Sequence, residues 1–422
     1  MAKFKRAKVV ALACVLALGL SACGSGGGSD EELSGELNLF LIPSPSSTAI
    51  QSFIPEFEEK TGVKVNVSET PYGEAHQKQL LSYNQKAGAY DIAQFDNSFL
   101  APFCQAQAMT PLGDWVNNSS EYDINDFGKG QQDYGKCANG DVYGLTLSTE
   151  PMIQWYRTDI YEKLGLKPAT TWDEWYANAK KVQDSGAGGQ LIGFGPNVSW
   201  WWMTMVWSFG GTLYDENLNP TVNSPEAIAA VDYMKKLLSV SPKGAITANG
   251  DEVTSKFLGE EIGAMLNYSG YYGMALDPAI NKHAGKFATA PMPKGAADIT
   301  HLAGWNIGIP ADAKNPNAAW AFLEFVLGKS NAKRYLESGA AAIGRKSIIS
   351  DSSLLDMNPY LPQLEIPESS RIERYPQIAV WPEFEAAAID AVTKVLTGKE
   401  QTKAAMDALN EKLKPILAKE PR

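Results

Sequence analysis

The stretch GELNLFLIPSPSSTAIQSFIPEFEEKTGVKVNV, residues 35–67, decides the fold class of this chain. Residues 36–41 alternate and then run apolar, as a β-strand does, and the prolines and serines of residues 43–47 end that strand. An amphipathic helix is expected from about Thr48 to Thr61, and Gly62 stops it. Residues 63–67 alternate again, which predicts a second strand.

The same order continues with a helix over about 74–87 and a third strand over 91–95. Strand, helix, strand, helix, strand predicts the α/β class, with a parallel sheet and right-handed crossovers. Ligands of such sheets bind at the loops that leave the carboxyl ends of the strands. We therefore expect the loops after the first and third strands to supply half of a binding site, with Ser44, Ser46, Asp96 and Asn97 as its candidate residues.

A second α/β block is expected from Gly144 onward. Thr171 and Glu174 have the spacing of a capping box, which predicts a helix that ends near Asp184. Ser224 followed by Pro225 predicts the start of another helix, with serine as the N-cap and proline in the first helical position.

The first residues have the composition of an export signal. Four basic residues precede an apolar run of about 12 residues, which is too short to remain as a membrane-spanning helix. Residues 20–23, Leu-Ser-Ala-Cys, resemble a bacterial lipobox, in which the cysteine is lipidated and becomes the first mature residue. We expect a signal peptide at 1–22, a lipid anchor on Cys23 and a flexible tether over 23–34. The alternatives are cleavage before Cys14, which would leave apolar residues on the mature chain, and an ordinary signal peptide with an incidental cysteine.

Removal of the signal takes away four positive charges and no negative ones, which changes the net charge from −11 to −15. A chain this acidic is not expected to bind nucleic acid or an anionic membrane surface. Two cysteines remain, Cys104 and Cys137, and in an oxidising compartment outside the cytoplasm we expect them to form a disulfide.

Several segments, in their order and spacing, resemble the extracellular solute-binding protein family 1, the sugar-binding receptors of bacterial ABC importers that include maltose-binding protein. They are residues 91–96 with 109–112, 155–159 with 165–174, Gly210-Gly211, 263–265 and 318–323. The resemblance spans nearly all of the mature chain. It implies a type II periplasmic-binding-protein fold, in which two discontinuous α/β lobes are joined by about three crossings and close on a ligand. The implied lobes are residues 35–146 with 302–328, and 150–298 with 332–422.

Four tryptophans gather in the stretch NVSWWWMTMVWSFGG, residues 197–211. A helix capped by Ser199 and running to about Phe209 would point them in different directions, because successive side chains on a helix are 100° apart. Trp202 and Trp207 are expected in the core.

Trp200 and Trp201 lie in the first turn of that helix, where the helix end would open on the ligand cleft. An aromatic plane matches the apolar face of a sugar ring, while carboxylates and amides match its hydroxyls. By its spacing, the resemblance implies further aromatic contacts with the ligand at Tyr271, Tyr272 and Trp381. Trp305, which opens a strand that returns to the first lobe, is another candidate.

Two charged residues are candidates for the polar part of the site. Glu150 stands six residues before Tyr156, a position that carries a ligand-contacting carboxylate in the family. Because Glu150 lies at an expected crossing between the lobes, an interlobe salt bridge is the alternative. Arg345 follows an apolar run and either faces the cleft or lies exposed on the surface.

No metal site or cofactor is expected. Asp215, Asn217, Asn219 and Glu226 match four positions of a calcium loop, but Pro220 stands where glycine makes the sharp turn. A hairpin turn is the better interpretation. The three histidines have no metal-ligand spacing and no Gly-x-Ser-x-Gly partner for nucleophilic hydrolysis.

The sequence thus predicts a lipid-anchored receptor outside the cytoplasm, monomeric and not an enzyme. It would capture a carbohydrate or polyol by lobe closure and deliver it to the permease of an ABC transporter with a cytoplasmic ATPase. One alternative is an extracellular glycoside hydrolase, which would also place carboxylates and aromatics around a sugar. The other is a receptor for glycerol phosphate or peptide, although clustered arginines or a glycine-rich helix start, which phosphate favours, are not evident near the expected loops.

Overall fold

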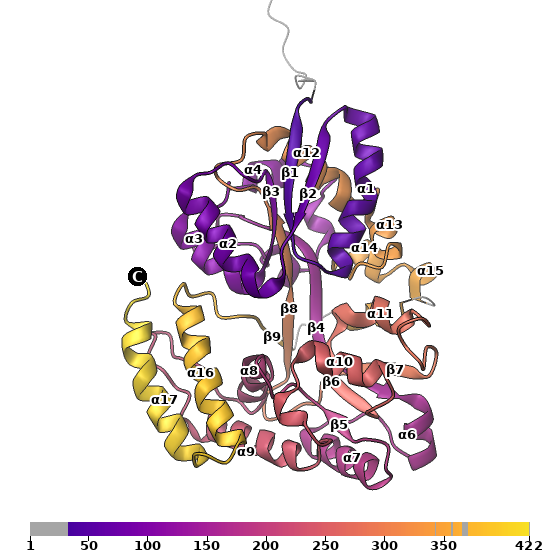
Figure 1. Cartoon of the computed structure of the whole chain (residues 1–422), viewed down its shortest axis with the longest axis vertical. Coiled ribbons are helices and arrows are strands. Elements are labelled where there is room, and N and C mark those ends of the chain that lie inside the picture. Colours follow the sequence, from indigo (N-terminus) through magenta and orange to yellow (C-terminus); the bar gives the residue numbers. More distant parts are fainter. Residues whose placement is uncertain (1–32, 342, 356–357, 365–369, 422) are drawn as a thin grey trace, which may run out of the picture. The chain divides into compact units, whose positions relative to one another are not determined.

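Helices and strands alternate along most of the chain, in a mixed α/β architecture (Figure 1). The computed structural model describes residues 33–341, 343–355, 358–364 and 370–421, which belong to one compact unit. The expected signal peptide, the expected anchor Cys23 and most of the expected tether lie outside the described residues. Within those ranges, no helix is both long enough and apolar enough to cross a membrane.

The N-terminal elements have the order that residues 35–67 predict. Strand β1 pairs in parallel with β2 and with β3, so the predicted parallel sheet is confirmed. The elements of this part are β1 (Glu36–Leu41), α1 (Pro45–Thr61), β2 (Lys64–Glu69), α2 (Tyr72–Gln85), β3 (Ile92–Asp96), η1 (Asn97–Phe99), α3 (Leu100–Ala106), α4 (Gly113–Asn118), η2 (Ile124–Asp126) and α5 (Lys129–Gln132).

Helix α1 begins at Pro45, earlier than the expected Thr48. The cause is a capping box that the sequence reading missed. The Ser44 hydroxyl accepts a hydrogen bond from the Ser47 backbone N–H at 3.1 Å, and the Ser47 hydroxyl accepts one from the Ser44 N–H at 3.0 Å. Proline suits the first turn because that position needs no N–H donor.

Two long strands join this part to the rest of the fold. Strand β4 (Leu145–Arg157) and strand β8 (Ile299–Gly308) pair with each other in antiparallel orientation. On one side β8 continues the order β2–β1–β3–β8, and we call this sheet with its helices the first lobe. On the other side β4 pairs with β6 (Ala264–Tyr268) and β7 (Phe287–Pro291), and this part is the second lobe.

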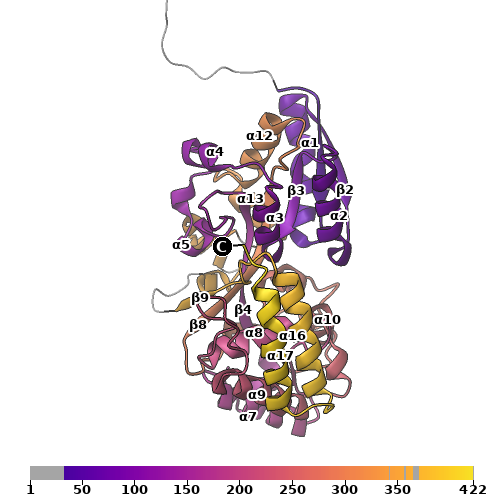
Figure 2. The same cartoon turned by 90° about the vertical axis from the view of Figure 1, so that its left-hand side faces the viewer.

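The second lobe contains the predicted capping box of Thr171 and Glu174 and the predicted N-cap Ser224, both confirmed. Figure 2 shows α16 and α17 side by side at its surface, and α16 packs against α8. Its remaining elements are α6 (Thr158–Leu164), α7 (Trp172–Asp184), β5 (Gln190–Leu191), α8 (Val198–Ser208), α9 (Pro225–Ser239), η3 (Ala245–Thr247), α10 (Gly250–Leu258), η4 (Ser269–Tyr271), α11 (Tyr272–Leu276), η5 (Leu361–Leu364), β9 (Arg371–Glu373), α16 (Trp381–Leu396) and α17 (Thr402–Leu417).

The residues after 328 divide differently from the expected lobes. Helix α12 (Pro316–Leu327) is followed by α13 (Ala332–Glu337), α14 (Lys346–Ile349) and α15 (Ser352–Leu355). Helix α13 packs on α1, and its Arg334 forms an ion pair with Glu56. Residues 332–341 and 343–349 therefore lie with the first lobe, whereas Tyr360 contacts Tyr272 of the second lobe.

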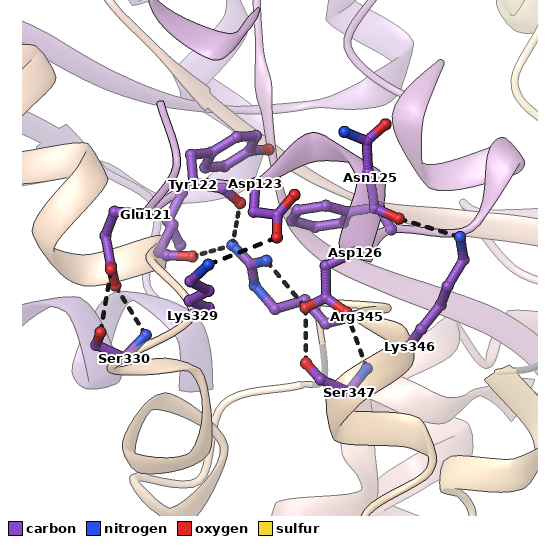
Figure 3. A network of polar contacts seen from close by, with 12 residues as sticks. Glu121, Tyr122, Asp123, Asn125, Asp126, Lys329, Ser330, Arg345, Lys346 and Ser347 are labelled. Atoms are coloured by element: carbon purple, nitrogen blue, oxygen red, sulfur yellow. Dashed lines mark hydrogen bonds and ion pairs between the residues drawn. The ribbon is translucent and has the colours of Figure 1, made fainter. Parts of the chain in front are cut away.

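A polar network holds that segment in place (Figure 3). The Arg345 guanidinium is fully buried, donates to the carbonyl oxygens of Tyr122 (2.7 Å) and Leu327 (2.6 Å), and pairs with Asp126 at 3.2 Å. It also lies over the Phe127 ring, 4.3 Å from the ring centre. Both expectations for Arg345, a cleft position or an exposed one, are therefore wrong, because the buried guanidinium pairs with the partly exposed Asp126 carboxylate and with two buried carbonyl groups.

Cys104 at the end of α3 and Cys137 before β4 form a disulfide. The segment that resembles a calcium loop is a turn. The Asp215 carboxylate accepts hydrogen bonds from the backbone N–H groups of Asn217 and Asn219, and Tyr214 pairs with Pro220 across it.

Candidate functional site

A cavity of about 400 Å³ lies among the loops at the carboxyl ends of β1, β3 and β6, beside the β4–β8 pair. This volume is within the range of small-molecule sites, roughly 300–1,000 Å³. The first lobe supplies Ile42, Pro43, Ser44, Pro45, Ser46, Tyr72, Asp96, Trp305 and Ala341. The second lobe supplies Asn197, Trp200, Gly250, Asp251, Tyr268, Gly270, Tyr271, Met274 and Tyr375, and the crossing strands add Glu150, Ala303 and Gly304.

The floor of the cavity is one row of side chains across three neighbouring strands. Asp96 of β3 lies opposite Trp305 of β8, and Trp305 lies opposite Ser148 of β4. Glu150 lies two residues beyond Ser148 on the same face, because successive side chains of a strand alternate between faces. Directly opposite residues have Cβ atoms about 5 Å apart, so Trp305 stands between Asp96 and the Ser148–Glu150 pair.

Six aromatic rings line the cavity, four of them from the second lobe and two from the first. Trp200 lies 5.8 Å from Tyr268, centre to centre, and the Tyr271 hydroxyl donates to Asp251 at 3.0 Å. On the first lobe Tyr72 meets Trp305 edge to face at 5.8 Å. The ligand space is therefore bounded by aromatic planes from both lobes.

Two carboxyl groups in the cavity are held in an unfavourable setting. Burial raises the pKa of Asp96 to about 6, although the Ser98 backbone N–H donates to it at 2.7 Å. Burial raises the pKa of Glu150 to about 7, and the Asp96 charge adds to that rise, against the Ser148 hydroxyl that donates at 2.7 Å. Burial costs the charged form its hydration, so both groups resist ionisation.

A glycine allows Glu150 to lie where it does. A Cβ atom on Gly270 would come within 2.3 Å of a Glu150 carboxylate oxygen, so any side chain there would displace the carboxylate. Among the described residues, Glu150 forms no salt bridge. The alternative expectation, that Glu150 forms a salt bridge between the lobes, is therefore not supported.

Helix starts add backbone donors to the wall. Helices α1, α8 and α10 all begin at the cavity, where Ser44, Asn197 and Gly250 line it. The first N–H groups of a helix have no partner within the helix and can donate to a ligand oxygen.

The structure brings seven of the twelve candidate ligand residues together in the cavity lining, where ligand contact stays a prediction. They are Ser44, Ser46, Asp96, Glu150, Trp200, Tyr271 and Trp305.

It does not bring the other five there. Asn97 donates to the Tyr134 carbonyl oxygen, Trp201 is fully buried with its indole N–H on the Leu266 carbonyl oxygen, and Arg345 lies in the network described above. Tyr272 packs between the Trp155 and Phe287 rings, and Trp381 stacks on Phe384. Trp200 and Trp201 cannot both face the cavity, because neighbours on a helix point 100° apart.

The helix that carries these tryptophans starts differently from the expectation. Asn197 is the N-cap of α8, and Ser199 lies inside the helix, where its hydroxyl donates to Glu385 at 2.7 Å. The expected core positions of Trp202 and Trp207 are confirmed by their burial.

Sequence reasoning missed several lining residues. Asp251 follows Asn249, the N-cap of a capping box with Glu252, and that signal was available. Tyr268 ends a strand, like Asp96, but Tyr375 lies in an irregular segment that gives no periodic signal.

The raised pKa of Glu150 predicts a pH-dependent stability. The folded chain holds the Glu150 proton more tightly than the unfolded chain, so this contribution to stability is present below about pH 4.5 and is lost as pH rises through about 7. Glu150→Gln should therefore have a higher free energy of unfolding than the wild type at pH 8, by up to about 3 kcal/mol, and no higher value at pH 4. Calorimetric melting without ligand measures this, with the exposed Glu162→Gln as a charge-matched control. Equal pH profiles for Glu150→Gln and the wild type would show that Glu150 is not strained.

Comparison with known proteins places the chain in a family. Residues 43–333 match the family described as bacterial extracellular solute-binding protein. A probable amino-acid ABC transporter periplasmic-binding protein of Sinorhizobium fredii is 25% identical, with 76% of this chain and 75% of that protein covered. The erythritol/L-threitol-binding protein of Mycolicibacterium smegmatis is 24% identical over 85% of this chain and 84% of its own length.

Among solved structures, an ABC transporter solute-binding protein from Agrobacterium radiobacter K84 in complex with ribitol superposes with a TM-score of 0.81 at 25% identity. The match covers 90% of this chain and 98% of that one. The family match spans well over half of the sequence and includes the residues that build the cavity from Pro43 to Trp305. This protein therefore belongs to the bacterial extracellular solute-binding proteins.

Proposed function

We propose that this protein binds a carbohydrate or polyol in the cavity between its lobes and delivers it to an ABC importer. The observation that carries the proposal is the combination of aromatic planes from both lobes with carboxyl groups on the floor between them. Aromatic faces suit the C–H surface of a sugar, and carboxylates accept hydrogen bonds from its hydroxyls. The relatives named for ribitol and for erythritol/L-threitol support this ligand class.

An amino acid, which the name of one relative suggests, suits this cavity less well. The α-carboxylate of an amino acid is best held by an arginine or lysine. The described lining contains no lysine, arginine or histidine side chain.

Glycoside hydrolysis is the rival function, and one observation favours it. A carboxyl group with a pKa of about 7, such as that of Glu150, is suited to act as a general acid. Mass spectrometry of oligosaccharides incubated with the protein separates the two, since a receptor returns them intact and a hydrolase shortens them.

The proposal includes a motion of the lobes about three connections. We assign residues 35–146, 302–341 and 343–349 to the first lobe and 150–298, 358–364 and 370–421 to the second, with β4, β8 and residues 350–355 as parts of the crossings. A closed state that contacts the ligand with both lobes has the higher affinity, and only such a difference can shift the equilibrium on binding.

The tryptophan helix provides a test with a built-in control. Trp200→Ala should weaken binding of the ligand found in a thermal-shift screen of sugars and polyols by roughly 5- to 150-fold, the value of one stacking plane of about 1–3 kcal/mol. Trp202→Ala should instead cost about 3–5 kcal/mol of folding stability with little loss of affinity in the folded protein, because Trp202 is fully buried. Calorimetric titration and melting measure both. If Trp200→Ala binds the ligand as tightly as the wild type, the Trp200 ring does not contact the ligand.

We further propose that the mature chain is a monomeric lipoprotein, held outside the cytoplasm by an acyl chain on Cys23. Cys23→Ala should abolish incorporation of a radiolabelled fatty acid. The variant should still fold, but it should either be released from the membrane or keep its signal peptide. Cys14→Ala, the matched control, should be labelled like the wild type. Labelling that survives Cys23→Ala would place the anchor elsewhere.

A further inference from the structure

All the charged side chains that line the cavity have the same sign. They are Asp96 on the first lobe, Glu150 on the crossing strand and Asp251 on the second lobe, and the described lining contains no basic side chain. Glu385 lies behind the wall, bonded to Ser199, and the Asp96 charge also acts on it. The cavity is therefore an acidic space inside an acidic protein.

These carboxyl groups have only neutral hydrogen-bond donors in the described part of the chain. Asp96 accepts from the Ser98 backbone, Glu150 from the Ser148 hydroxyl and Asp251 from the Tyr271 hydroxyl. Outside the cavity, the buried Arg345 does have a partner of opposite charge, because it pairs with Asp126 at 3.2 Å. Asp96 is buried and Glu150 is half-buried, whereas Asp251 is exposed to solvent. Carboxylates that have lost hydration are rarely left without a cation, because that hydration is then not replaced, and this applies to Asp96 and Glu150.

The aromatic rings of the cavity are a second, independent reason to expect a positively charged ligand. Trp305 lies directly opposite Asp96 on one side and Ser148 on the other, with Glu150 two residues beyond Ser148 on the same face. Trp200 and Tyr271 line the cavity from the other lobe. The faces of tryptophan and tyrosine are electron-rich and attract a cation within about 6 Å of the ring centre. Carboxylates and ring faces therefore favour the same charge on the ligand.

Three kinds of carbohydrate can be compared against this cavity. An anionic sugar would bring a like charge next to Asp96 and Glu150. A neutral sugar can donate hydroxyl hydrogens, but it leaves the negative charges uncompensated or requires the carboxyl groups to keep their protons. An ammonium group donates up to three hydrogen bonds, accepts none and supplies the missing positive charge.

We infer that the preferred ligand is a carbohydrate or polyol carrying a protonated amino group, with the ammonium bound beside Glu150 and Trp305 on the floor that also carries Asp96. This inference rests on the proposed function, since it specifies the ligand of the same cavity. It specifies the charge of the ligand and where that charge is bound. The rest of the ligand makes the contacts already proposed, with its C–H surface on the aromatic rings and its hydroxyls on polar groups.

The test compares probes in which one hydroxyl-bearing group is exchanged for a charged one, or two such groups in the disaccharides. One set is D-glucosamine, D-glucose and D-glucuronate, a second is 1-amino-1-deoxysorbitol, sorbitol and gluconate, and a third is chitosan and cellulose disaccharides. Calorimetric titration at pH 7.5 should give the amino member of the best-binding set an affinity at least about tenfold above its neutral counterpart, since charge-assisted hydrogen bonds are about twice as strong as neutral ones. The acidic members should bind most weakly.

A variant locates the effect. Glu150→Gln should reduce the amino-over-neutral ratio about tenfold or more, because the amino probe loses a charge-assisted hydrogen bond whereas the neutral probe exchanges a carboxylate acceptor for an amide acceptor. The exposed Glu162→Gln, which changes the net charge equally, should leave the ratio as in the wild type. An unchanged ratio in Glu150→Gln would overturn the assigned position of the ammonium.

The outcomes separate this inference from the proposed function. If a neutral sugar or polyol binds as tightly as its amino counterpart, the inference is wrong and the carbohydrate receptor stands. If no member of any set binds, and the protein as purified carries a peptide or other non-carbohydrate by native mass spectrometry, both fail.

Discussion

The antiparallel pairing of β4 with β8 is the interaction on which the rest of this structure depends. Residues 145–151 and 302–307 form the only ladder, among the described residues, that joins the sheets of the two lobes. Gly304 makes their close approach possible, since a Cβ atom there would come within 2.2 Å of the Ser148 carbonyl oxygen. The register then fixes the cavity floor, because it sets Glu150 and Trp305 on the same face as Asp96.

The aromatic residues around the cavity floor are held firmly in place, whereas the carboxyl groups on it are in an unfavourable environment. The aromatic residues around it are held by ring contacts and hydrogen bonds, as Tyr268 is by Trp200 and by the buried His301, 3.4 Å from its hydroxyl. The carboxyl groups of Asp96, which is buried, and of Glu150, which is half-buried, have no basic partner in the described residues. A site that is destabilised when empty and satisfied when filled ties ligand binding to the stability of the fold, since whatever binds only the folded state adds to its stability.

The fold could be predicted from the sequence largely because its signals are local. Alternation in residues 36–41 and 63–67, the capping box at Thr171 and the Ser224-Pro225 start each depend on neighbours in the chain, and each is found in the structure. Asp96, Glu150 and Trp305 were accessible because strand ends and family spacing point to the cavity. Arg345 and Trp381 were misplaced because their surroundings come from residues more than 100 positions away or from an irregular segment. Tyr375 gave no signal, since no periodic element carries it into the wall.

The most direct test of this account is a crystal structure of the protein with its tightest-binding ligand from the sugar and polyol screen. The account predicts one ligand in the cavity, with a ring or carbon chain against Trp200 and polar groups within hydrogen-bond distance of Asp96 and Glu150, so that both lobes contact it. A ligand held by one lobe alone, or bound outside the cavity, would contradict it.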